Sequence, residues 1–237
     1  MQMRRRFAIP SLFTALLTAI LLVAGCSSDS ETSDAPLPDA ATLLQESAST
    51  TKAQQSVHLV LSLQGTIEGL PLEKLDGDLT NTPEVAAQGT ADLVYMGGKF
   101  ADVKFAVSEG NLYAAITPGE PLSLFGPAAD VYDVSTILNP DNGLANLLAN
   151  FNDATADGRE AINGTETVRV TGTVSAEAVK KIAPKLSIDT PVPATAWIAE
   201  EGDHALLQAK LEPSAGNSIT MTMSDWGKQV TVTKPGA

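Results

Sequence analysis

Side chains able to do acid–base or nucleophilic chemistry are few in this 237-residue chain. Its two histidines are His58, on the polar side of an alternating apolar pattern, and His204, just after a Gly-Asp turn. We expect both to be solvated or capping groups rather than bases or ligands. The sequence holds no Gly-x-Ser-x-Gly, His-Glu-x-x-His or Walker motif and no pair of cysteines. It therefore predicts a protein that is not an enzyme and has no cofactor.

Two charged clusters are the other places where chemistry is conceivable. Residues 153–158 begin like a calcium loop, but Gly164 stands where the bidentate glutamate belongs, so no metal site is expected. Lys180, Lys181 and Lys185 form the one basic cluster of an acidic chain. They either complement the dipole of a helix, which we favour, or meet the phosphate headgroups of a lipid.

The single cysteine, Cys26, closes an export signal. Arg4, Arg5 and Arg6 precede an apolar stretch that ends in Val23-Ala24-Gly25-Cys26. The order aliphatic, small, Gly, Cys resembles the bacterial lipobox, in which the cysteine is acylated and becomes the first mature residue. We therefore expect a signal peptide over residues 1–25 and lipid attachment at Cys26, on the outer face of the cytoplasmic membrane and in part released to the cell wall.

Charge and composition divide the rest into a tether and one domain. The formal charge is −13, and the chain from Cys26 onward is more negative still, which argues against nucleic acid. Residues 26–38 are acidic, serine-rich and end in Pro36-Leu37-Pro38, which indicates a lipidated acidic tether. Residues 39–237 are expected to form a single domain, because a chain of this length buries one hydrophobic core.

Period-two alternation dominates the domain and predicts a large antiparallel sheet, because the turns between strands are short. The expected strands cover residues 57–64, 89–96, 100–107, 112–117, 166–174, 195–199, 204–211, 218–224 and 228–233. Asp39 is expected to cap a helix to about Gln55, and further helical segments are expected over 133–138, 143–151 and 176–183. The predicted fold class is α+β, a curved antiparallel sheet with helices covering one face; the half-barrel form and the enclosed apolar cavity follow only from the family resemblance given next.

Six segments resemble the mycobacterial LppX/LprA/LprF/LprG family of lipoproteins. They span the chain from the tether to near its end and comprise residues 36–40, 56–61, 125–133, 138–146, 191–195 and 230–235. The resemblance implies a half-barrel around an apolar cavity. It also implies binding of acylated glycolipids (phosphatidylinositol mannosides, lipomannan and lipoarabinomannan) and of triacylglycerol, carried from the inner membrane toward the outer envelope. A major-facilitator exporter in the inner membrane is the implied partner, and we expect a monomer.

The strand over residues 89–96 corresponds to one that lines the lipid pocket in that family, so the resemblance places Ala91, Leu93 and Tyr95 in the cavity. A one-residue slip before Gly97-Gly98 would turn Val94 and Met96 inward instead. Alternation alone adds the other expected lining residues: Leu59, Leu61, Leu63, Val103, Phe105, Val168 and Val170. The alternative function is a lipid-independent envelope scaffold or accessory protein for an exporter, with a solid core in place of a cavity.

Overall fold

The computed structural model describes residues 35–70, 72–95 and 97–236. The predicted export signal, the lipobox with Cys26, and the tether up to Asp34 lie outside the described residues. Within the described part, no helix combines the length and the apolar character needed to cross a bilayer.

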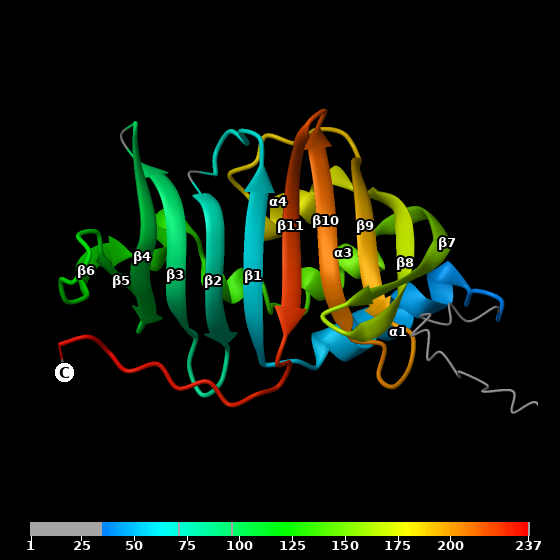
Figure 1. Ribbon diagram of the computed structural model, residues 1–237, viewed down its shortest axis with the longest axis horizontal. Helices are drawn as coiled ribbons and strands as arrows, with labels where there is room; N and C mark the ends of the chain where they lie inside the picture. Colours follow the sequence, from blue (N-terminus) through cyan, green and yellow to red (C-terminus); the bar gives the residue numbers. More distant parts are fainter. Residues whose placement is uncertain (1–34, 71, 96, 237) are drawn as a thin grey trace, which may run out of the picture. The chain divides into compact units, whose positions relative to one another are not determined.

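The described part is an antiparallel sheet with short helices (Figure 1). The strands are β1 (Ser56–Gln64), β2 (Leu72–Thr80), β3 (Ala86–Tyr95), β4 (Gly98–Ser108), β5 (Asn111–Ala115), β6 (Ser123–Pro127), β7 (Phe151–Ile162), β8 (Thr165–Val174), β9 (Val192–Ala199), β10 (Leu206–Ser214) and β11 (Asn217–Ser224). The helices are α1 (Ala40–Lys52), α2 (Ala128–Val131), the 3₁₀ turn η1 (Val134–Thr136), α3 (Leu144–Ala149) and α4 (Ala176–Ile182).

The first and last strands, β1 and β11, lie side by side at the centre of the sheet. From β1 the chain winds outward through successive neighbours to β6 at one edge, and from β7 at the other edge it winds back to β11, which pairs with β1. The connection between the two edges is the crossover α2–η1–α3. This crossover lies with α1 and α4 behind the sheet in Figure 1, so all the helices share one face. The predicted α+β class, with an open antiparallel sheet covered on one side, is confirmed.

Local sequence explains why the two longest helices begin where they do. The Asp39 side chain accepts a hydrogen bond from the backbone N–H of Thr42 at 2.8 Å, and the Ser175 hydroxyl accepts one from the N–H of Ala178 at 3.2 Å. Both are N-caps, as predicted. The same bond to Thr42 lowers the pKa of Asp39. The helices then bury leucine and valine side chains such as Leu43 and Val179 against the sheet.

Three strands were not predicted, and each has a weak strand signal. β2 has four charged residues and a glycine among its nine. β6 has five residues and ends in Gly-Pro, and β7 is rich in Asn, Asp and Ala. Their place in the sheet comes from pairing with stronger neighbours rather than from local propensity.

The strand predicted over residues 228–233 is wrong. This segment is extended but pairs with no strand among the described residues. The preceding strand, β11, already has β1 and β10 on its two sides, so a hairpin partner has no free edge to join. The chain instead crosses the ends of the strands, where Gly227 donates to the Ser56 carbonyl at 3.0 Å and Ser56 donates to the Lys228 carbonyl at 2.6 Å.

Candidate functional site

The helix-covered face of the sheet carries one unbroken row of apolar side chains. Because directly opposed residues of an antiparallel sheet point to the same face, the pairings define the row strand by strand. From β7 to β4 it reads Ala156, Val170, Ala196, Ala209, Met221, Leu61, Leu75, Ala91 and Val103. We call this face, with the helix side chains packed on it, the apolar layer. Four of the nine residues in this row are alanine, so many of its side chains project only a short way from the sheet.

The predicted lining residues fall on this face as far as their side chains are described. Leu59, Ala91, Val103, Val168 and Val170 are buried. Leu61, Leu63 and Phe105 are partly buried and pack against the same core. Leu93 is half-buried. Their position on the apolar layer makes them candidates for contact with a ligand, and whether they touch one stays a prediction.

The register of β3 runs without a break through the region where a slip was conceivable. The irregularity opposite β2 adds a residue to β2, between Leu72 and Lys74, and the irregularity opposite β4 adds one to β4. The bulge in β4 is held by Asp102, whose N–H donates to the Asp92 carboxylate at 2.8 Å and whose φ is 53°. Leu93 therefore keeps the facing of Ala91. Tyr95 pairs with Gly98 in the backbone, and its side chain lies outside the described residues, as does Met96.

The pocket beneath α3 in the apolar layer is small. The pocket between α3 and strands β9 and β10 has a volume of about 10 Å³ and is lined mostly by leucine and alanine, including Leu144, Leu148, Ala194 and Ala209. That volume is about one water-sized probe and is far below an acyl chain. The sheet and helices are as expected, whereas the pocket between them has no room for a ligand in this structure.

The contact between α1 and α3 includes an open cleft. A cleft of about 370 Å³ opens between the two helices, lined by small residues such as Ala48, Ala145 and Ala149. Close by, the Ser47 hydroxyl and the Asn146 side-chain nitrogen are buried and make no hydrogen bond within the described part of the chain. The two helices thus meet here through small side chains and buried polar atoms that lack partners within the described residues.

The cleft also holds a serine and a lysine at the spacing Ser-x-x-Lys, Ser49 and Lys52. Both lie on α1, and Lys52 is ion-paired to Asp141 at 3.4 Å. The Lys52 side chain is 59% exposed. A lysine so solvated and paired is not arranged as the general base of a serine nucleophile, because such lysines are desolvated.

The histidines and the lysines of the basic cluster pair with acidic side chains and backbone carbonyls in this structure. His58 lies on the outer face between Asp76 and Asp78, with 2.9 Å from Nδ1 to Asp78. Lys180 and Lys181 stand in the last turn of α4 and pair with acidic side chains, and Lys185 donates to the carbonyls that end α2. No group of three or more His, Cys, Asp and Glu side chains in the described ranges is placed to hold a metal ion, and residues 153–158 are part of strand β7.

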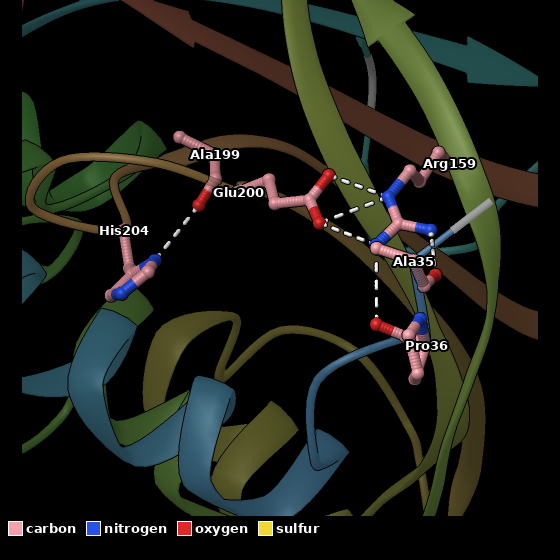
Figure 2. A network of polar contacts seen from close by, with 6 residues as sticks. All are labelled: Ala35, Pro36, Arg159, Ala199, Glu200 and His204. Carbon is pink, nitrogen blue, oxygen red and sulfur yellow. Dashed lines mark hydrogen bonds and ion pairs between the residues drawn. The ribbon is translucent and has the colours of Figure 1, made fainter. Parts of the chain in front are cut away.

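A clamp on the incoming chain is the polar feature that sequence reasoning missed (Figure 2). Arg159 on β7 binds both carboxylate oxygens of Glu200 at 2.6–2.9 Å, and its guanidinium also donates to the carbonyls of Ala35 at 2.9 Å and Pro36 at 3.3 Å. The Arg159 side chain is only 7% exposed. Hydrogen bonding to Arg159 lowers the pKa of Glu200, and the same bonds raise that of Arg159. His204 completes the view, with Nδ1 3.0 Å from the Ala199 carbonyl oxygen.

The clamp fixes the point at which the tether becomes the domain. Arg159 and Glu200 are 41 residues apart, and neither belongs to a local motif, so no signal in the sequence pairs them. Arg159 lies on the same side of the sheet as its pairing partner Val168, and this becomes apparent only once β7 and β8 are paired.

The described residues thus form an open antiparallel sheet with an apolar layer on one face, covered by short helices. Comparison with known proteins identifies the family. Residues 39–232 match the model of the LppX_LprAFG lipoprotein family, and the chain belongs to that family.

Two relatives and two solved structures illustrate the similarity. The chain is 72% identical, over 100% of both chains, to the lipoarabinomannan carrier protein LprG of Mycolicibacterium smegmatis. It is 52% identical to the protein of the same name from Mycobacterium tuberculosis, over 98% of this chain and 95% of that one. The crystal structure of LprF from Mycobacterium bovis matches with a TM-score of 0.77 at 30% identity, over 85% of this chain and 99% of that one. Lipoprotein LppX of M. tuberculosis matches with a TM-score of 0.63 at 28% identity, over 81% and 97%.

Proposed function

We propose that this chain carries acylated glycolipids across the mycobacterial envelope, with their acyl chains held in the apolar layer. The proposed cargo is phosphatidylinositol mannosides, lipomannan and lipoarabinomannan, together with triacylglycerol. One observation carries the proposal: a row of nine apolar side chains, four of them alanine, crosses the sheet from β7 to β4 beneath a cover of short helices. The 72% identity to a protein named a lipoarabinomannan carrier supports it.

The energetics of carriage favour such a layer. Each acyl methylene gains about 0.8 kcal/mol on leaving water, so a tail does not cross an aqueous space unaided at a useful rate. Transfer from a bilayer to an apolar layer changes that free energy little. The protein would therefore lower the barrier to desorption without trapping the cargo. Polar sugars would stay in water, and selectivity would rest on the number and length of the tails.

Loading requires the helices to move away from the sheet, because the closed pocket of about 10 Å³ admits no tail. The contact between α1 and α3 is where we place this opening. It has the cleft, the small side chains and the buried polar atoms without partners. α3 lies in the crossover between the two edges of the sheet, so a displacement of α3 would uncover the layer without breaking a strand pair.

The proposed location follows from Cys26. Acylation there would anchor the domain to the outer face of the cytoplasmic membrane, and two or more chains give stable anchoring where one does not. A major-facilitator exporter in the same membrane is the proposed partner that delivers the lipid.

Mass spectrometry of lipids bound to the protein purified from a mycobacterial host tests the proposal. We expect acylated glycolipids or triacylglycerol in a fixed molar ratio to the protein. Protein free of acylated lipid would count heavily against carriage and in favour of a lipid-independent scaffold, which the small pocket in the apolar layer also fits.

A further inference from the structure

The edge of the sheet opposite the clamp exposes an apolar patch. Leu124 is 64% exposed and Phe125 48%, both on edge strand β6; Val131 on α2 is 43% exposed and Ile116, just after β5, is 38%. These are the exposed large hydrophobic residues of the described part of the chain, and they gather at one end of an eleven-stranded sheet. Exposed apolar side chains concentrated in this way mark a surface that contacts a partner or a membrane. We call these four residues the edge patch.

The edge patch is not built to pair with another strand. Phe125 sits at a bulge, because the register with β5 shifts between Leu112 and Tyr113. Gly126 follows with a φ of 146°, and Pro127, which has no N–H, ends the strand. Bulges and prolines are the devices that block strand addition at a sheet edge. The edge strand β6 therefore offers a partner its side chains rather than its backbone hydrogen-bonding groups. None of its five residues is charged.

The patch is held in place by polar contacts behind it. Ala128 donates to the Gly110 carbonyl at 2.9 Å, which ties the start of α2 to the β4–β5 turn. Lys185 donates to the Val131 carbonyl at 2.8 Å, and the Tyr132 hydroxyl donates to the Ile182 carbonyl at 2.8 Å. Burial raises the pKa of Tyr132, so this donor keeps its proton. An apolar edge braced in this manner loses little conformational freedom on contact.

The tether supplies the argument for a bilayer. The clamp holds Ala35, and nine residue steps separate Ala35 from Cys26, a span of at most roughly 32 Å at about 3.5 Å per step. Ten strand spacings of about 4.8 Å separate β7 from β6, or roughly 48 Å along the sheet. An edge at that distance reaches the anchoring membrane by rotation of the domain about Ala35.

We propose that the edge patch inserts into the outer surface of the bilayer as a second point of attachment, at the end of the sheet opposite the clamp. The proposal rests on the proposed anchor at Cys26. A protruding, uncharged strand edge suits a soft apolar medium, whereas a rigid protein partner calls for a concave or flat surface with polar groups at its rim. Contact at both ends would hold the apolar layer against the lipids that it exchanges.

A thiol-reactive, environment-sensitive dye on Leu124→Cys tests the insertion. The full acylated chain is purified in detergent, labelled and reconstituted on phosphatidylcholine vesicles, with brominated lipids as quenchers. Ala215→Cys is the matched control, because Ala215 is exposed in the turn between β10 and β11. We expect a blue shift and loss of most fluorescence to brominated lipid at position 124, and neither at position 215.

The other outcomes overturn the proposal, and each points to a different cause. Equal signals at 124 and 215, or none at 124 on vesicles that retain the protein, refute insertion of the edge while leaving the anchor intact. A blue shift at 124 that depends on protein concentration and appears without vesicles assigns the edge to a second copy of the chain. Dye uptake by the wild-type protein exposes a free Cys26 thiol and refutes the anchor, and the two-point attachment with it.

Discussion

A tryptophan at position 91 separates a carrier from a solid scaffold. Ala91 is 6% exposed on the apolar layer, directly between Leu75 and Val103, and lies outside the central core cluster. In a solid core the added indole overpacks the layer and costs about 1–3 kcal/mol. For a domain of this size that is roughly 2–12 °C in Tm. In a carrier the helices over the layer shift as they would for an acyl chain, so the loss of stability stays near the lower of these values. The indole then occupies the space of the lipid.

The assay pairs thermal unfolding with mass spectrometry of bound lipid for Ala91→Trp purified from a mycobacterial host. Thr90→Trp is the matched control, because Thr90 is the neighbouring residue on the opposite, helix-free face of β3. We expect Ala91→Trp to lose bound acylated lipid with a small drop in Tm and Thr90→Trp to keep its lipid. Full lipid content in Ala91→Trp, or equal loss in both variants, would refute the placement of the acyl chains.

Three further predictions concern the caps and the clamp. Ser175→Ala removes the N-cap of α4 and should lower stability by about 1 kcal/mol, roughly 2–4 °C in Tm, while Ser175→Asp should restore it. Asp39 has a lowered pKa in the folded state, so its contribution to the free energy of unfolding is present above the ordinary value of 3.8 and is lost as the pH falls through the folded pKa. Asn still caps the helix but does not titrate, so Asp39→Asn should unfold with a shallower acid dependence below about pH 4, measured by circular dichroism. Glu200→Gln should loosen the hold of Arg159 on Ala35 and speed proteolysis just before the domain. Protonation of Glu200 in the wild type should have the same effect, at a pH below the ordinary 4.5 because its pKa is lowered. Unchanged cleavage would contradict the clamp.

Strong alternation made strands such as β1, β8 and β11 predictable, whereas β2, β6 and β7 form because of their neighbours. β1 reads Val57, Leu59, Leu61 and Leu63 on one face, and the two-residue Asn163-Gly164 turn joins β7 to β8 as its residue types predict. β7 itself has alanines where larger side chains would have signalled a strand. Its low side chains belong to the apolar layer, so the feature that concealed the strand is the one the proposed function needs.

The sequence predicts which side chains share the apolar face, but not whether helices cover that face. Alternation identifies which side chains share the apolar layer, because a strand has only two faces. It carries no information about whether helices lie on that face or stand away from it. That depends on packing between α1 and α3, which are about ninety residues apart in the chain. The clamp was out of reach for the same reason, because Arg159 and Glu200 meet only after β7, β8 and β9 are paired.

The most direct test of the account is the separation of α3 from the sheet with and without cargo. Spin labels at Ala149, exposed on α3, and at Thr195 on β9, report that distance by pulsed electron resonance in the acylated protein. The account predicts a longer distance in protein loaded with acylated glycolipid than in protein stripped of lipid. An identical distance in both, with lipid shown to be bound, would contradict a ligand layer between helices and sheet.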